Sequence, residues 1–187
     1  RASDVLQQAD WAAHRSHDQG GGQAVFFQAA MGQQIRDRYR LEQELRRAAP
    51  ENQLRIYLQP QIDANGRQVS AEALIRWEHP ERGLVPPGMF IPLAETSGQI
   101  LRMGEWVMHT AARQLKTWLD QGMPPVTMAV NLSAIQFRDP GLVATVARVL
   151  HETGLPPTCL ELELTESIAM SDPLGTVATI DELHAMQ

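Results

Sequence analysis

The chain has 187 residues, a formal net charge of −6 and 43% hydrophobic residues, a composition typical of a folded globular protein. Its few basic residues lie among acids, so a nucleic acid is not the expected partner, and the single cysteine, Cys159, excludes an internal disulfide framework. No apolar run approaches the roughly 18 residues that span a bilayer, and the N-terminus has no signal-peptide pattern. We therefore expect a soluble, cytoplasmic chain, and a membrane anchor upstream of Arg1 in a longer parent protein stays open.

The N-terminal part of the chain, residues 2–27, is too short to bury a core of its own. It predicts a short helix, a glycine break at residues 20–22 and a brief strand at residues 24–27. Residues 31–49 have helical spacing and Pro50 ends the run, so we expect a connecting helix. This helix serves either as a linker or as the dimer-forming element of a homodimer, and its spacing favours neither.

From residue 52 onward, four short segments alternate polar and apolar side chains, as strands with one polar and one apolar face do. The segments are residues 56–61, 70–77, 127–133 and 160–165. Their polar side chains are Tyr57, Gln59, Gln61, Ser70, Glu72, Arg76, Thr127, Asn131, Ser133, Glu161, Glu163 and Thr165. Four matching polar faces suggest one shared polar site. Helical spacing between the strands predicts helices near residues 89–97, 100–121, 143–153 and from about 174.

The connections between these segments indicate how the strands pair. About fifty residues separate the second strand from the third and about twenty-five separate the third from the fourth, which suits the crossovers of parallel strands. Crossover helices cover the apolar faces and leave the polar faces toward a barrel interior or a cleft, where carboxylates need a metal or a cation. We therefore predict an α/β fold, a TIM-like (β/α)8 barrel. The alternative is an antiparallel sheet with a solvated polar face, which fits the connection lengths less well.

Five motifs follow one another along this part of the chain. They are Gln59-Pro60; Glu72-Ala73-Leu74-Ile75-Arg76-Trp77 with His79-Pro80; Phe90-Ile91-Pro92-Leu93-Ala94-Glu95; Asn131-Leu132-Ser133 with Gln136-Phe137; and Glu163-Leu164-Thr165-Glu166-Ser167. In this order they resemble the EAL-domain family of cyclic di-GMP phosphodiesterases over about residues 52–187. The resemblance implies a barrel of the EAL type, with only about its first half in this chain.

The N-terminal piece carries a second resemblance. Its Ala9-Asp10, glycine run and Phe26-Phe27 are similar to the closing segment of a GGDEF domain, although the Gly-Gly-Asp-Glu-Phe loop is not in the chain and no cyclase activity is assigned. The two resemblances imply a GGDEF-like remnant at residues 1–30, a connecting helix at residues 31–50 and the N-terminal half of an EAL domain at residues 51–187.

The EAL resemblance implies a metal site. The family's metal ligands correspond here to Glu72, Asn131 and Glu163, all on the polar parity of their strands, and Glu72 would act in catalysis through the metal. Hard oxygen ligands of this kind suit Mg²⁺ or Mn²⁺. The resemblance implies that these three side chains are part of the ligand set of the family's two-metal site.

The same resemblance implies a substrate site. Gln59 and Arg76 match residues that hold the dinucleotide, Leu74 matches a lining position, and the planar fork of Arg76 suits a phosphate. Glu166 falls just past its strand on the other parity and is expected to support an active-site loop. His79 is expected to be structural, at a turn.

The implied activity is metal-dependent hydrolysis of one phosphodiester bond of cyclic di-GMP to linear pGpG in the intact parent protein, a reaction of bacterial second-messenger signalling. The chain offers about half of the strands of a barrel, and the family's Asp pair, Lys and later Glu and Gln are not in it, so the 187 residues alone are expected to be inactive. One alternative is a non-catalytic cyclic di-GMP receptor module that signals to a partner; the intact ligands favour catalysis. Another is an unrelated barrel, which the motif order disfavours.

Overall fold

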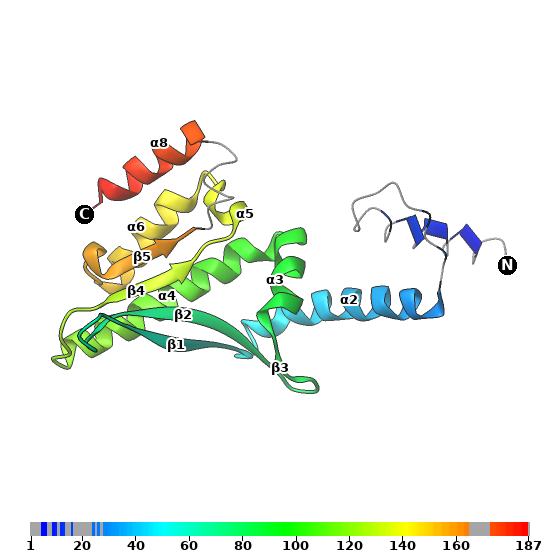
Figure 1. Cartoon of the computed structure of the whole chain (residues 1–187), viewed down its shortest axis with the longest axis horizontal. Coiled ribbons are helices and arrows are strands. Elements are labelled where there is room, and N and C mark those ends of the chain that lie inside the picture. The colour runs from blue at the N-terminus through cyan, green and yellow to red at the C-terminus, as the bar shows by residue number, and fades with distance from the viewer. Residues whose placement is uncertain are drawn as a thin grey trace. The chain divides into compact units, whose positions relative to one another are not determined.

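The computed structural model describes residues 28–164 and 173–186 without a break, together with residues 5–6, 9–10, 12–13, 16, 24 and 26. Its contacts divide the chain into two compact units, Arg1–Arg46 and Arg47–Gln187 (Figure 1). The glycine break predicted at residues 20–22 lies outside the described residues.

In the first unit, the described residues 5–6, 9–10 and 12–13 are helical, as their spacing predicts. Ala24 and Phe26 have no regular structure, so the strand predicted over residues 24–27 is not found at them. A segment this short does not form a stable strand from its own sequence, because a strand gains its stability from pairing and packing.

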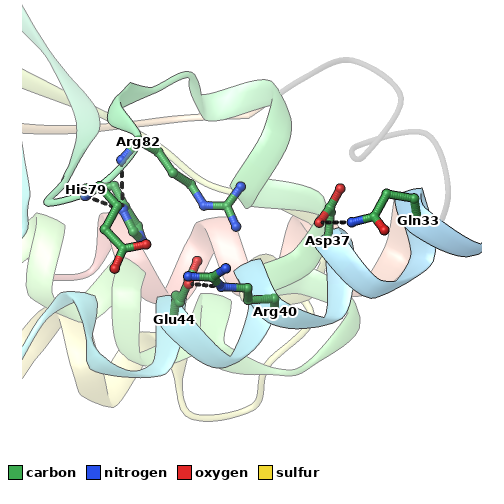
Figure 2. A network of polar contacts seen from close by, with 7 residues as sticks. Gln33, Asp37, Arg40, Glu44, His79 and Arg82 are labelled. Atoms are coloured by element: carbon green, nitrogen blue, oxygen red, sulfur yellow. Dashed lines mark hydrogen bonds and ion pairs between the residues drawn. The ribbon is translucent and has the colours of Figure 1, made fainter. Parts of the chain in front are cut away.

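The helix predicted over residues 31–49 is present as α2, Ala29–Ala48. Its exposed face carries side-chain pairs at i and i+4, among them Arg40 with Glu44 at 2.7 Å and Gln33 with Asp37 at 2.9 Å (Figure 2). The helix ends two residues before Pro50, since a proline disfavours helical backbone at the residue before it.

The second unit contains one sheet of five strands in the order β1-β2-β4-β5, with β3 paired to β2 outside this path (Figure 1). The strands are β1 Leu54–Ile62, β2 Gln68–His79, β3 Gly83–Val85, β4 Thr127–Asn131 and β5 Leu160–Glu163. The pairs β2–β4 and β4–β5 are parallel, as the long connections predict. The α/β architecture of the barrel type is therefore confirmed for this part of the chain.

The first strand departs from the parallel pattern, because β1 and β2 are antiparallel. The turn between them is too short for a crossover, and it is closed by Asp63, whose carboxylate accepts the backbone N–H groups of Asn65 and Arg67 at 2.8 and 2.9 Å. The backbone N–H of Arg67 lowers the pKa of Asp63 most, and that of Asn65 lowers it further. Gly66 supplies the positive φ of 76° that the turn requires.

Helices connect and cover the parallel strands. They are α3 Pro87–Thr96, α4 Gln99–Asp120, α5 Ala134–Phe137, α6 Leu142–Thr153, the 3-10 turn η1 Pro157–Cys159, and α8 Pro173–His184. The first two lie between β2 and β4, and α5 and α6 lie between β4 and β5. Gly154 ends α6 in the left-handed conformation with φ 67°, as its place in the sequence predicts.

The hydrophobic core lies between the sheet and helices α4 and α6. Ala73 and Val130 on the strands and Leu115 and Val149 on the helices are buried in one cluster. Cys159 is buried in the same cluster, which supports the expectation that it is a small core residue.

A second packed group forms where β2 turns into β3. Trp77 and Phe90 are fully buried and meet edge to face, with ring centroids 5.8 Å apart. His79 is also buried, and its Nδ1 accepts the backbone N–H groups of Glu81 at 3.1 Å and Arg82 at 3.2 Å (Figure 2). The histidine therefore holds the turn, as expected. No helix in the described part of the chain is long and apolar enough to cross a membrane.

Candidate active site

Four strands present their polar side chains on one face of the sheet, here called the polar face. Gln59 of β1 lies opposite Glu72 of β2, and Asn131 of β4 lies opposite Glu163 of β5. Glu72 lies opposite Ala129, two residues before Asn131 on the same face of β4. The alternation read from the sequence therefore falls on one common face, because residues directly opposite each other share a face.

Two of the three expected metal ligands are in direct contact. Asn131 Nδ2 donates a hydrogen bond to Glu72 Oε1 at 2.6 Å. The third, Glu163, is held beside them because the backbone N–H of Leu132 donates to the carbonyl oxygen of Glu163 at 2.9 Å and extends the pairing of β4 with β5 past the strand end. The carboxyl ends of β4 and β5 thus meet at the polar face, where β/α barrels place their active sites.

The carboxylates of the polar face repel one another. Burial raises the pKa of Glu163, and the negative charges of Glu72 and Glu161 raise it further. A hydrogen bond from the side chain of Gln61 lowers the pKa of Glu163 and opposes part of this effect. Gln61 lies on the polar parity of its strand, so the parity alone could have added it to the candidate site.

Arg76 lies near the end of β2 on the same face. Its guanidinium carbon lies 5.6 Å from the ring centroid of Tyr57, and Nη1 donates to the carbonyl oxygen of Ile75 at 2.9 Å. Leu74, Arg76 and Asn131 all line a cleft of about 540 Å³. Glu72 is hydrogen-bonded to the lining residue Asn131, but Glu72, Glu163 and Gln59 are not themselves among the residues that line the cleft.

The opposite wall of the cleft comes from helices that the strand pattern does not identify. It includes Pro87, Ile91, Glu95, Gly104, Ser133 and Gln136. These residues belong to α3, α4 and the start of α5, and only the packing of the helices brings them to the cleft. The remaining expected residue, Glu166, lies outside the described residues.

The donor atoms of this site fit a hard divalent cation. Glu72 and Glu163 offer carboxylates, and the Asn131 amide presents Oδ1 in place of Nδ2 when it turns over. A cation between the carboxylates would also relieve the repulsion that raises the pKa of Glu163. Within residues 28–164 and 173–186, no three His, Cys, Asp or Glu side chains lie close enough to hold a metal, so two carboxylates and an amide are the set on offer.

The fold and the site together define a domain of the β/α-barrel type with carboxylate and amide side chains at its strand ends. The EAL domain family model matches residues 42–187, and the chain belongs to this family. It is 42% identical over 184 residues to the bifunctional diguanylate cyclase/cyclic di-GMP phosphodiesterase MucR of Pseudomonas aeruginosa, covering 98% of this chain and 27% of that protein. It is 39% identical over 182 residues to the cyclic di-GMP phosphodiesterase PdeR of Escherichia coli, covering 97% of this chain and 27% of PdeR.

A solved structure of the PaMucR phosphodiesterase in complex with c-di-GMP superimposes on the chain with a TM-score of 0.77. The sequence identity is 46%, and the match covers 79% of this chain and 60% of that one. The chain thus spans about a quarter of the length of the curated relatives it matches.

Proposed function

We propose that the protein containing this chain hydrolyses one phosphodiester bond of cyclic di-GMP to linear pGpG, and that the reaction depends on Mg²⁺ or Mn²⁺. The observation that supports it best is the contact of Asn131 with Glu72 beside Glu163, at the edge of a cleft that also holds Arg76. The relatives described as cyclic di-GMP phosphodiesterases add to this support.

Each residue would have a separate task. Glu72, Asn131 and Glu163 would hold the cation, which when bound supplies a metal-activated water and neutralises charge on the leaving oxygen. Arg76 would donate two parallel hydrogen bonds to a phosphate, and its contact with Tyr57 limits the positions that its guanidinium adopts. Leu74 would form an apolar wall for the dinucleotide, Gln59 would bind its polar edge, and Glu166 would support the adjoining loop.

We propose the same domain organisation that the motifs imply. Residues 51–187 would be the N-terminal half of an EAL domain, residues 31–50 a connecting helix and residues 1–30 the remnant of a GGDEF-like domain. Turnover is proposed for the complete natural polypeptide. The 187-residue chain by itself is expected to be inactive, because the described sheet has five strands, including the short β3, whereas a β/α barrel closes with eight.

The experiment is an assay of cyclic di-GMP with the purified full-length polypeptide and Mn²⁺ or Mg²⁺, with pGpG measured by chromatography. We expect turnover that a chelator stops and that Glu72→Ala abolishes. Glu78→Ala is the matched control, because Glu78 lies on the same strand and parity but is paired with Arg55 at 3.1 Å. Binding of cyclic di-GMP without cleavage would favour the receptor alternative, and neither binding nor cleavage would overturn the proposed function.

A further inference from the structure

Gly104, in the second turn of α4, lies directly against the side chain of Gln136. A Cβ built on Gly104 would lie 1.8 Å from Gln136 Nε2 and 2.8 Å from Gln136 Cδ, so the amide of Gln136 lies directly against the helix backbone. A glycine inside a helix costs about 1 kcal/mol relative to alanine. Gly88, in the first turn of α3, has nothing within 4 Å of its built Cβ.

Gln136 is a buried polar residue, with 5% of its surface exposed, and it closes a capping box at the start of α5. Its Oε1 accepts the backbone N–H of Ser133 at 3.1 Å, and its own backbone N–H donates to Ser133 Oγ at 3.3 Å. The helix α5 spans only Ala134–Phe137 and packs on α4 (Figure 1). A helix of one turn is not stable alone, so the box and this packing must hold it in place.

The capped turn begins at the candidate site. Asn131 is the last residue of β4, buried Leu132 follows it, and Ser133 is the N-cap of α5. On one side the turn is fixed to β5 by the hydrogen bond from Leu132 to Glu163. On the other side it is held by the box between Ser133 and Gln136 and by the side chain of Phe137, which is buried in the hydrophobic core. The direction in which Asn131 leaves the sheet therefore depends in part on how the side chain of Gln136 lies against α4.

We propose that Gln136, seated on Gly104, is a positioning residue that sets the amide of Asn131 for Glu72 and for the divalent cation. This inference rests on the proposed function, since it assigns to Asn131 the role of a metal ligand. It gives a physical reason for a glutamine at this place: its acceptor holds the turn while its flat amide fits against a glycine.

The test is the affinity for Mn²⁺, measured on the full-length polypeptide by electron paramagnetic resonance without substrate. Residues that orient a metal ligand typically change metal affinity about 10–100-fold when removed, and we expect a loss of this size for Gln136→Ala. Gln136→Glu should retain the affinity, because a glutamate also closes a capping box. With substrate, Gln136→Ala should lower kcat more than it raises KM.

Gly104→Ala tests the other residue of the Gly104–Gln136 contact. A methyl group 1.8 Å from Nε2 must displace the Gln136 side chain, so this variant should lose Mn²⁺ affinity to the same extent as Gln136→Ala. The double variant should be no worse than either single one, because both remove the same contact. Gly88→Ala, at a helical glycine with open space, is the matched control and should leave the affinity unchanged.

Three results separate the explanations. A lower melting temperature with unchanged Mn²⁺ affinity and kcat would overturn the proposal and leave Gln136 a purely structural residue. A raised KM with unchanged Mn²⁺ affinity would overturn it as well, because Gln136 lines the cleft and would then bind substrate directly.

If the unmodified protein binds Mn²⁺ but does not cleave cyclic di-GMP, the proposed function fails, and the Mn²⁺ titrations of the variants still decide the positioning role. If Gln136→Ala does not fold, Gly104→Ala and Gln136→Glu decide it.

Discussion

The two faces of one sheet differ in almost every physical respect, although their residues alternate along the same strands. On the apolar face, Ala73 and Val130 are buried beneath α4 and α6 in the hydrophobic core. On the polar face, Asn131 is exposed and pairs with Glu72, and Glu163 carries a raised pKa among other carboxylates. Neighbouring residues therefore have opposite tasks: one face stabilises the fold, and the other accepts repulsion between like charges to form a site.

The sharpest way to test this comparison is to change neighbours on opposite faces, beginning with Asn131→Ala. Its side chain is exposed, so the free energy of unfolding should change little. Turnover of cyclic di-GMP should fall about 10²–10³-fold, as when one preorganised polar group of an active site is removed. Steady-state kinetics and a urea titration of the same sample measure both. A large loss of stability with unchanged turnover per folded molecule would reverse the roles assigned to the two faces.

The neighbouring Val130→Ala should have the opposite signature. Val130 is 1% exposed, and removing two buried methyl groups should lower the free energy of unfolding by about 2 kcal/mol. The kcat of the folded fraction should not change. Val69→Ala is the control for loss of the same groups at an exposed strand position, where urea denaturation should show less than ~0.5 kcal/mol. Equal losses at the two valines would show that burial does not govern stability in this sheet.

The sequence predicts the polar face well because the period of a strand is two, so the placement of Glu72, Asn131 and Glu163 on one face follows from their spacing. The parallel pairs likewise follow from connection length. The antiparallel pairing of β1 with β2 follows from their short connection, which the shared alternation of the four segments does not reveal.

Other features of the site depend on tertiary packing that no local pattern encodes. The wall of the cleft from α3 includes Pro87, the first residue of that helix. The contact of Gly104 with Gln136 joins two helices, and although Gln136 belongs to one of the motifs, nothing in the sequence pairs it with Gly104. A helical glycine and a short capping motif became informative only when the structure placed them against each other.

Within the polar face, Arg76→Lys should have a smaller effect than loss of Asn131. Lysine keeps the positive charge but cannot make two parallel hydrogen bonds to a phosphate, so one charge-assisted hydrogen bond is lost. The KM for cyclic di-GMP should rise about tenfold with little change in kcat, since such a bond contributes roughly 1.5–3 kcal/mol. Arg55→Lys, at an exposed ion pair with Glu78, is the control. A fall in kcat without a rise in KM would place Arg76 in the chemical step instead.

The smallest expected effect is on stability, and it tests whether the polar face is under electrostatic strain. Because the pKa of Glu163 is raised above its ordinary value of 4.5, the folded state binds this proton more tightly than the unfolded state. The carboxyl group therefore contributes stability below about pH 4.5, and that stability is lost as the pH rises through the folded pKa. Glutamine does not titrate, so Glu163→Gln should match the unmodified protein near pH 4 and melt at a higher temperature at pH 7, by less than about 3 °C.

Divalent metal should reverse this difference. Mn²⁺ stabilises whatever folded state binds it, so at pH 7 it should raise the melting temperature of the unmodified protein and have much less effect on Glu163→Gln. Thermal melts from pH 4 to pH 8, with Mn²⁺ and with a chelator, measure both effects. A difference between the two proteins that does not change with pH would show that the burial of Glu163 and its repulsion by Glu72 and Glu161 do not act on stability. The polar face would then differ from the apolar face in composition alone.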